Sequence, residues 1–90
     1  MRRLKATRRQ VPLDRVDEYD TAWIRLQAHA RAAGCNAWRF RSAQRQDVFL
    51  EFLEWKTHTP PPGEVATAQT ALDMIAPGNT DEWEEAAATE

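Results

Sequence analysis

The chain has 90 residues, of which 42% are hydrophobic and 29% are charged, and its formal net charge is −2. This length predicts a single domain over residues 1–90, and the composition excludes a largely disordered chain. A single cysteine, Cys35, excludes an internal disulfide and favours a reducing, cytoplasmic setting. The basic start, MRRLKATRRQ, lacks the apolar run of a secretion signal. No stretch approaches the roughly 20 apolar residues of a membrane span, so we expect a cytoplasmic protein without a membrane partner.

Charge is unevenly distributed along the chain. Residues 1–45 hold 11 Lys and Arg against 4 Asp and Glu, a net charge of +7, whereas residues 46–90 hold 1 against 10, a net charge of −9. A basic half can indicate a nucleic-acid partner. The basic residues are spread over several predicted elements, however, and do not cluster with exposed aromatic residues. We therefore expect the two halves to neutralise each other on folding and do not expect nucleic acid as the main partner.

The first predicted elements are a strand and a helix. Residues 3–11 have no helical period and precede Pro12, which predicts a strand with Leu4 and Ala6 on one face and Lys5, Thr7 and Arg9 on the other. Residues 14–33 predict an amphipathic helix with Asp14 as its N-cap. Its apolar stripe recurs at spacings of three and four residues: Val16, Tyr19, Trp23, Leu26, Ala30 and Ala33. Gly34 supplies the left-handed stop.

A β-hairpin is predicted next. Residues 37–43, AWRFRSA, alternate apolar and polar, and the polar QRQD separates them from a second strand over residues 48–56. One register pairs Trp38 with Phe52 and Phe40 with Leu50. It also places Arg39 opposite Glu51 and Arg41 opposite Phe49, and a cross-strand charge pair of this kind contributes roughly 0.2–1 kcal/mol.

The remainder of the chain predicts two helices. Residues 57–63, THTPPPG, form a loop because three prolines cannot continue a ladder or a helix interior. Residues 64–75 suit a second helix that buries its apolar positions, Val65, Ala68, Leu72 and Ile75. After the break at APGN, residues 80–88 predict a short acidic helix, capped by Asn79 or Thr80 and anchored by Trp83.

This order favours an α+β domain in which helices cover one face of an antiparallel sheet. The strand over residues 48–56 is apolar on both faces, so one face needs a second cover. We assign Trp38, Phe40, Val48, Leu50 and Phe52 to the face beneath the helices. The reverse face then carries Phe49, Leu53 and Trp55. A patch of this kind usually marks an interface, so we expect a symmetric homodimer that packs sheet against sheet through it.

Several motifs resemble the dimeric α/β-barrel superfamily of ferredoxin-like domains, which includes the antibiotic-biosynthesis-monooxygenase-like proteins. The resemblance covers residues 3–75 and is carried by the helix ending in AAGC, the WRF strand and the strand FLEFLEWKT. It implies a face-to-face dimeric barrel with a cleft between sheet and helices. The family usually ends in a fourth strand, whereas the tail TDEWEEAAATE predicts a short helix in place of, or before, that strand.

The resemblance implies little about chemistry. Haem-degrading members use a Trp at the end of this strand, a His on the second helix and an Asn on the first strand. Trp55 matches the first, but the second helix has no His and the first strand no Asn. Without an axial ligand we expect no haem, and Trp55 is carried over only as a residue lining a pocket.

The reverse face is also the candidate ligand site. Arg39, Arg41 and Glu51 would stand there among Phe49, Leu53 and Trp55, with Thr7 and Arg9 of the first strand nearby. An apolar groove with two arginines suits a small apolar or anionic ligand. The alternative is that the Arg39–Glu51 pair and its neighbours form salt bridges within a dimer interface.

Candidates for catalysis are few. His58 follows Trp55 in the loop and could move a proton near neutral pH, as could Glu51. His29 predicts a helix-surface residue and Cys35 a small buried one. The two histidines and the cysteine lie far apart in sequence, so we expect no metal and no other cofactor.

Three functions remain open from the sequence. The first is a homodimeric domain without catalysis, serving structure, regulation or the binding of a small ligand. The second is a cofactor-independent monooxygenase or isomerase acting on an aromatic or polyketide-like molecule, which requires an apolar cavity of several hundred Å³ beside Trp55 or His58. The third is nucleic-acid binding through the arginines of residues 2–9.

Overall fold

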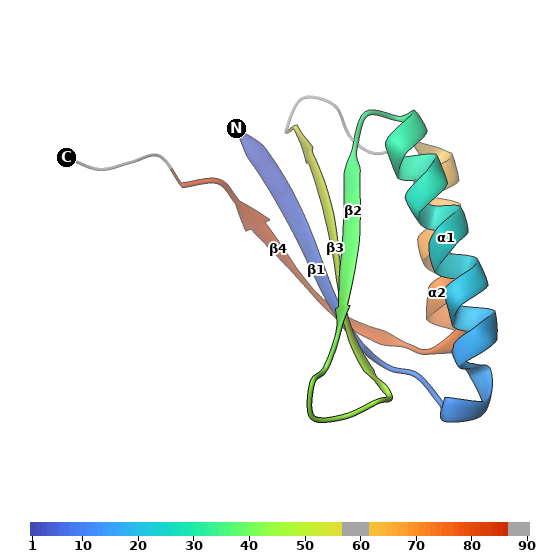
Figure 1. The fold of residues 1–90 in the computed structure, drawn as a ribbon. Helices are drawn as coiled ribbons and strands as arrows, with labels where there is room; N and C mark the ends of the chain where they lie inside the picture. The colour runs from blue at the N-terminus through green and yellow to red at the C-terminus, as the bar shows by residue number, and fades with distance from the viewer. Residues whose placement is uncertain (57–61, 87–90) are drawn as a thin grey trace.

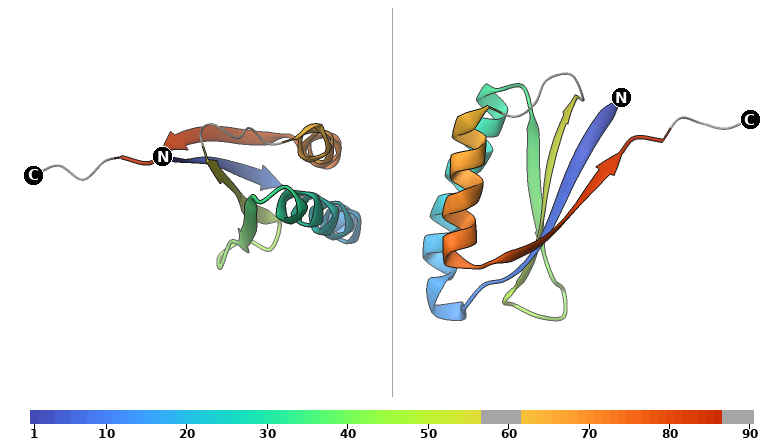
Figure 2. Two further views of the ribbon diagram at one scale, coloured as in Figure 1. Left: turned by 90° about the horizontal axis from the view of Figure 1, so that it is seen from above. Right: turned by 180° about the vertical axis from the view of Figure 1, so that it is seen from behind.

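Two helices lie side by side against one face of a four-stranded antiparallel sheet (Figures 1 and 2). The computed structural model describes residues 1–56 and 62–86. Its elements are β1 (Arg2–Gln10), a 3₁₀ turn (Leu13–Arg15), α1 (Val16–Ala32), β2 (Asn36–Arg41), β3 (Val48–Lys56), α2 (Gly63–Ile75) and β4 (Gly78–Glu84). The strands lie in the order β2-β3-β1-β4, so β1 is central and the last strand is its neighbour. The predicted α+β class with helices on one face is confirmed.

The helices form where the apolar periods predict them. Tyr19, Trp23, Leu26 and Ala30 of α1 are buried, and so are the four predicted positions of α2. Gly34 follows α1 with a φ of 78°, a left-handed conformation that favours glycine. The predicted N-cap is wrong: the chain enters α1 through the 3₁₀ turn after Pro12, and no side chain caps either start.

The hairpin has the predicted register. Trp38 pairs with Phe52, and Arg39 pairs with Glu51. The Ser42 hydroxyl accepts hydrogen bonds of 3.1 Å from the backbone N–H groups of Gln44 and Arg45, which fixes the turn between the two strands.

The predicted assignment of the two sheet faces is wrong. Phe49 and Leu53 lie beneath the helices, where Phe49 is 4% exposed, whereas Phe40 on the opposite face is 60% exposed. Both faces of β3 are apolar, so its own pattern could not decide which face the helices cover. We call the side of the sheet away from the helices the helix-free face. Its apolar members are Leu4, Ala6, Trp38, Phe40, Leu50, Phe52 and Trp83.

The predicted C-terminal helix is also wrong, because residues 78–84 form the strand β4. This strand pairs with the open edge of β1, and Arg3 lies opposite Glu84 and Lys5 opposite Glu82. Pairing with a basic strand outweighs the weak helical preference of this acidic segment, since tertiary context overrides propensity. The basic start and the acidic end therefore meet in one sheet.

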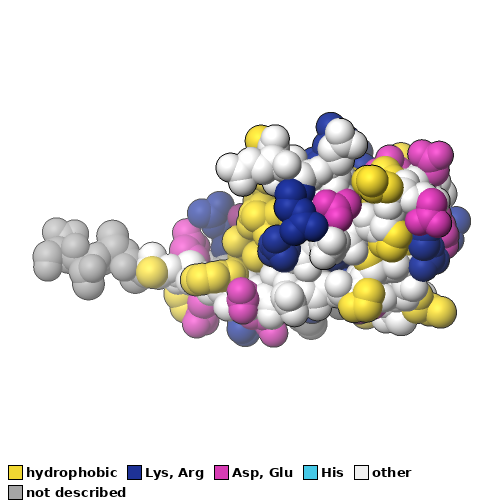
Figure 3. Space-filling model, turned by 90° about the horizontal axis from the view of Figure 1, so that it is seen from below, with side chains coloured by type: hydrophobic (Ala, Val, Ile, Leu, Met, Phe, Trp, Pro, Cys, Tyr) yellow, Lys and Arg dark blue, Asp and Glu magenta, His cyan; other side chains and the backbone are white. Residues whose placement is uncertain are grey.

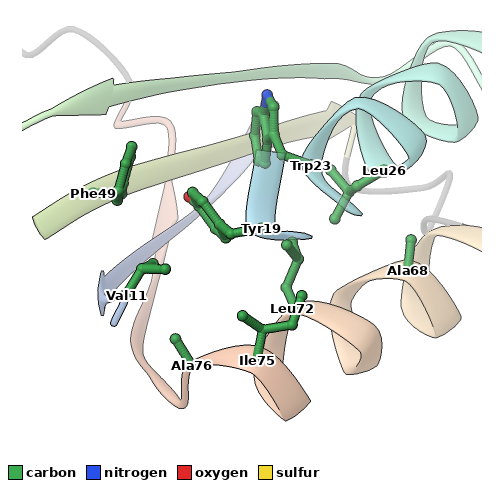
Figure 4. Packing of buried hydrophobic residues seen from close by; sticks show 9 residues of the cluster. All are labelled: Val11, Tyr19, Trp23, Leu26, Phe49, Ala68, Leu72, Ile75 and Ala76. Atoms are coloured by element: carbon green, nitrogen blue, oxygen red, sulfur yellow. The ribbon is translucent and has the colours of Figure 1, made fainter. Parts of the chain in front are cut away.

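Two apolar clusters fill the space between sheet and helices. The larger one joins α1 and α2 to β3 (Figure 4) and consists of Val11, Tyr19, Trp23, Leu26, Phe49, Ala68, Leu72, Ile75 and Ala76. The smaller one consists of Ala30, Cys35, Leu53 and Val65, with Trp55 packed against it. Among the described residues, neither helix is long and apolar enough to cross a membrane.

Candidate functional site

Glu51 stands at the centre of a polar network beneath the helices. It lies on β3 between Phe49 and Leu53, which point the same way, and all three are buried. Its Oε2 atom accepts a hydrogen bond of 2.9 Å from Arg9 Nε and one of 2.7 Å from the Tyr19 hydroxyl. A buried carboxylate is tolerated only when it is paired, so these two donors account for its position.

Arg9 connects this carboxylate to the end of α2. The side chain is 2% exposed, and its Nη1 atom donates hydrogen bonds of 2.7 Å to Asp73 Oδ1 and to the carbonyl oxygen of Ala76. Burial disfavours the charged guanidinium, but Glu51 and Asp73 outweigh this effect and raise the pKa of Arg9. Arg15 Nη1 donates a further hydrogen bond of 3.2 Å to the carbonyl oxygen of Ile75. The last turn of α2 carries no basic residue, so these two arginines supply the positive charge that a helix C-terminus favours.

Tyr19 is held as a neutral donor. Burial and the neighbouring Glu51 carboxylate both disfavour a phenolate and raise the pKa of Tyr19 above its usual value of 10.0. The Tyr19 ring also contacts Phe49 at a centroid distance of 4.7 Å. The phenol is therefore part of the packing and of the polar network at once.

Arg39 covers this group from β2. Its guanidinium carbon lies 5.1 Å from the ring centroid of Tyr19, 5.6 Å from Trp23 and 5.4 Å from Phe49, within the range of cation–π attraction. Its Nη1 atom forms an ion pair with Asp20 Oδ1 at 2.8 Å but has no hydrogen-bond partner among the described residues. The guanidinium is thus engaged on both sides by its own chain.

The other predicted site residues are separated. Phe49 and Leu53 are core residues, and Trp55 is half-buried against the smaller cluster. Arg41 is exposed near the end of β2. His58 lies outside the described residues. The structure therefore does bring Thr7, Arg9, Arg39 and Glu51 to one face of the sheet, as predicted, but beneath the helices and not on an open surface.

The space around Glu51 is nearly filled. A crevice of about 10 Å³ lies beside Lys5, Thr7, Glu51 and Gln69, which is close to the room that one water molecule needs. Trp55 lines neither this crevice nor the two larger hollows of the described residues. These lie elsewhere: about 550 Å³ beside Arg25 and His29, between the outer sides of the helices, and about 440 Å³ on the helix-free face.

The network can hold charges and fix geometry, but it leaves little room for a reacting molecule. One oxygen of Glu51 already accepts two donors, and the Tyr19 proton points at that oxygen. Within residues 1–56 and 62–86, no three His, Cys, Asp or Glu side chains are grouped closely enough to hold a metal ion. Cys35 is buried, and burial raises the pKa of its thiol, so it is a poor nucleophile.

Sequence reasoning missed two members of the network, Tyr19 as a donor and Asp73 as an acceptor. A signal for the first was present. Glu51 alternates with Phe49 and Leu53, and a carboxylate at a core position requires a donor from a facing element. Tyr19 was the one residue of the helical stripe with a hydroxyl.

Several solved structures resemble this chain in fold. SnoaB, a cofactor-independent oxygenase from Streptomyces nogalater, superposes with a TM-score of 0.78 at 13% identity, over 97% of this chain and 95% of that chain. A protein from Nitrosomonas europaea assigned to the antibiotic biosynthesis monooxygenases gives 0.73 at 11% identity, over 92% and 97%. A conserved protein of unknown function from Bacteroides thetaiotaomicron gives 0.75 at 21% identity, over 93% and 96%.

Neither a family model nor a curated protein matches the sequence. At these identities the superpositions establish the fold and leave the activity open. The chain has the ferredoxin-like α+β fold of the antibiotic-biosynthesis-monooxygenase-like proteins.

Proposed function

We propose that this protein is a cytoplasmic, non-catalytic domain that forms a homodimer through the helix-free face of its sheet. The observation that carries this proposal is the exposure of aromatic residues there. Phe40 and Trp83 are exposed, and Trp38 and Phe52 stack beside them at 5.3 Å. Figure 3 shows hydrophobic side chains gathered beside basic ones on the side away from the helices. Monomeric proteins rarely expose a contiguous apolar patch of this kind.

The closed interior supports the absence of catalysis. The residues that could move a proton or bind an anion beneath the helices, Glu51, Arg9 and Arg39, are all engaged by other side chains of the chain. The crevice beside them holds about 10 Å³, whereas small-molecule sites usually offer several hundred.

Nucleic-acid binding has less support. Three of the four arginines in residues 2–9 already face carboxylates: Arg2 lies 3.5 Å from Glu54 and 3.1 Å from Glu85, Arg3 lies 4.0 Å from Glu82, and Arg9 is buried with Glu51. A basic strand neutralised by its own sheet offers little to a phosphate backbone.

The second candidate function is a cofactor-independent oxygenase or isomerase acting on an aromatic or polyketide-like molecule. Two observations favour it: SnoaB, which is named a cofactor-independent oxygenase, shares the fold, and the helix-free face has a hollow of about 440 Å³. Such an enzyme would have to bind its substrate outside the space beneath the helices. Oxygen uptake with a polyphenolic substrate would favour this candidate over the first.

Solution mass by light scattering tests the homodimer. We expect a dimer for the wild type and a folded monomer for Phe40→Asp. Ile24→Asp is the matched control, because Ile24 is 63% exposed and Phe40 60% exposed, but Ile24 lies on the outer side of α1. A wild-type monomer, or a Phe40→Asp variant that remains fully dimeric, would refute the proposal.

A further inference from the structure

The helix-free face contains a hollow on one side of its centre. It measures about 440 Å³, and its apolar wall consists of Leu4, Ala6, Leu50, Phe52 and Trp83. Ala6 lies on β1 between Phe52 of β3 and Asp81 of β4. The hollow exists because a methyl group occupies the central strand while larger side chains stand around it.

The same face carries projecting aromatic residues on the other side of β3. Phe40 and Trp38 belong to the edge strand β2 and do not line the hollow. The Phe40 ring meets Phe52 edge-on at a centroid distance of 6.0 Å, and the side chain is 60% exposed. A raised aromatic patch and a hollow therefore flank β3 on a single surface.

We infer that the helix-free face is complementary to itself, so that Phe40 of each copy fills the hollow of the other. This inference rests on the homodimer proposed above and adds its register, meaning which residues of the two packed sheets lie opposite each other. A two-fold axis along β3 lays β2 of one copy over β1 and β4 of the other. Because a symmetric interface repeats every contact, each ring finds a hollow and each hollow a ring.

The chemistry of the hollow suits an aromatic ring. Its wall is mainly apolar, with Arg8, Asn79 and Asp81 as its polar members. Aromatic residues seated in a dry pocket commonly dominate interface energetics. Arg8 lies at its edge and forms no ion pair with another described side chain. Its guanidinium can cover the face of the entering ring, as Arg39 already does within the chain.

Paired variants test this register. Ala6→Phe fills the hollow, and Phe40→Ala removes the ring. We expect each to raise the dimer dissociation constant by about 30-fold or more, since a buried aromatic anchor is an interface hot spot. In an equimolar mixture of the two variants, Phe40 of the Ala6→Phe chain enters the intact hollow of the Phe40→Ala chain. At the second contact, the phenylalanine introduced by Ala6→Phe occupies the space that Phe40 of the other chain would have filled. The mixture should therefore form a heterodimer, seen by native mass spectrometry, and the Ala6→Phe/Phe40→Ala double variant should dimerise again.

The outcomes separate this inference from the proposed homodimer. A wild-type monomer removes both. A wild-type dimer that Phe40→Asp disrupts, combined with no association in the mixture, keeps the homodimer and overturns this register. Circular dichroism checks that each variant folds, and Ala6→Leu is the smaller substitute if Ala6→Phe does not. If the wild type is a monomer that binds 8-anilinonaphthalene-1-sulfonate, and Ala6→Phe abolishes this binding, the hollow is a small-ligand site and the inference is wrong.

Discussion

The Tyr19 hydroxyl donates a hydrogen bond of 2.7 Å to Glu51 Oε2 and thereby joins α1 to the middle of β3. Arg9 donates to the same oxygen from β1 and continues to the C-terminus of α2. One carboxylate oxygen thus links four elements through two side chains. A polar connection at this depth should affect stability strongly, and its environment raises the pKa of Tyr19.

Titration of Tyr19 tests this environment directly, because Tyr19 is the only tyrosine in the chain. Its folded pKa is raised above the unfolded value of 10.0. We therefore expect no phenolate absorbance at 295 nm near pH 10 in the folded protein and normal titration in urea. The same shift predicts a loss of stability above pH 10, because only the unfolded chain releases the proton there.

The pH dependence has a matched control. Above pH 10 the free energy of unfolding should fall by up to about 1.4 kcal/mol per pH unit for one titrating group. Tyr19→Phe should remove this contribution from the slope of stability against pH. Equal slopes for wild type and Tyr19→Phe would show that burial and Glu51 do not raise the pKa of Tyr19 in the folded protein.

Arg9→Met should destabilise the protein more than its loss of packing explains. Methionine keeps the apolar stem but leaves Glu51 buried with one donor fewer, and breaking a buried ion pair costs about 3–5 kcal/mol. Urea unfolding measures this cost. The double variant Arg9→Met/Glu51→Gln should recover much of it, because the uncompensated charge is gone. Additive losses would contradict a coupled pair.

Gly78→Ala should weaken the attachment of β4. A methyl group at Gly78 would collide with the Thr7 side chain and press on Arg9 at 3.1 Å. Overpacking of this kind costs about 1–3 kcal/mol. Gly63→Ala is the control, since nothing lies within 4 Å of a methyl group there. Equal thermal stability of the two variants would place the start of β4 elsewhere.

Leu53→Asp separates the two assignments of the sheet faces. Leu53 belongs to the core, so a carboxylate there should cost about 4 kcal/mol or more and should abolish the folded circular dichroism spectrum. Phe40→Asp should keep that spectrum. If Leu53→Asp gave a well-folded monomer, the face carrying Phe49, Leu53 and Trp55 would be the open one after all.

Local patterns predicted most of the secondary structure. The stripe of α1, the apolar positions of α2 and the register of the hairpin depend on spacing within one segment, and all three are confirmed. Spacing reports which residues share a face, so Arg9, Arg39 and Glu51 were correctly grouped. Spacing alone could not predict that Arg9, Arg39 and Glu51 lie beneath the helices, because charged residues are usually expected at the surface unless a buried partner is known.

The last strand could not be found from its own residues. TDEWEE favours a helix when considered alone, and its role as a strand depends on pairing with β1, far earlier in the sequence. The Thr7 and Thr80 hydroxyls lie 2.9 Å apart across this pair. Only the opposite charges of the two halves of the sequence indicated that its first and last segments would pair.

The position of β1 between β3 and β4 has a consequence for synthesis. The first strand of the domain lies at the centre of the sheet, and its second neighbour, β4, is synthesised after every other helix and strand that the structure describes. Until then β1 presents an unpaired edge, which invites pairing with other chains. A nascent chain that stops before residue 78 would keep that edge, so premature termination should yield aggregates rather than a smaller folded domain.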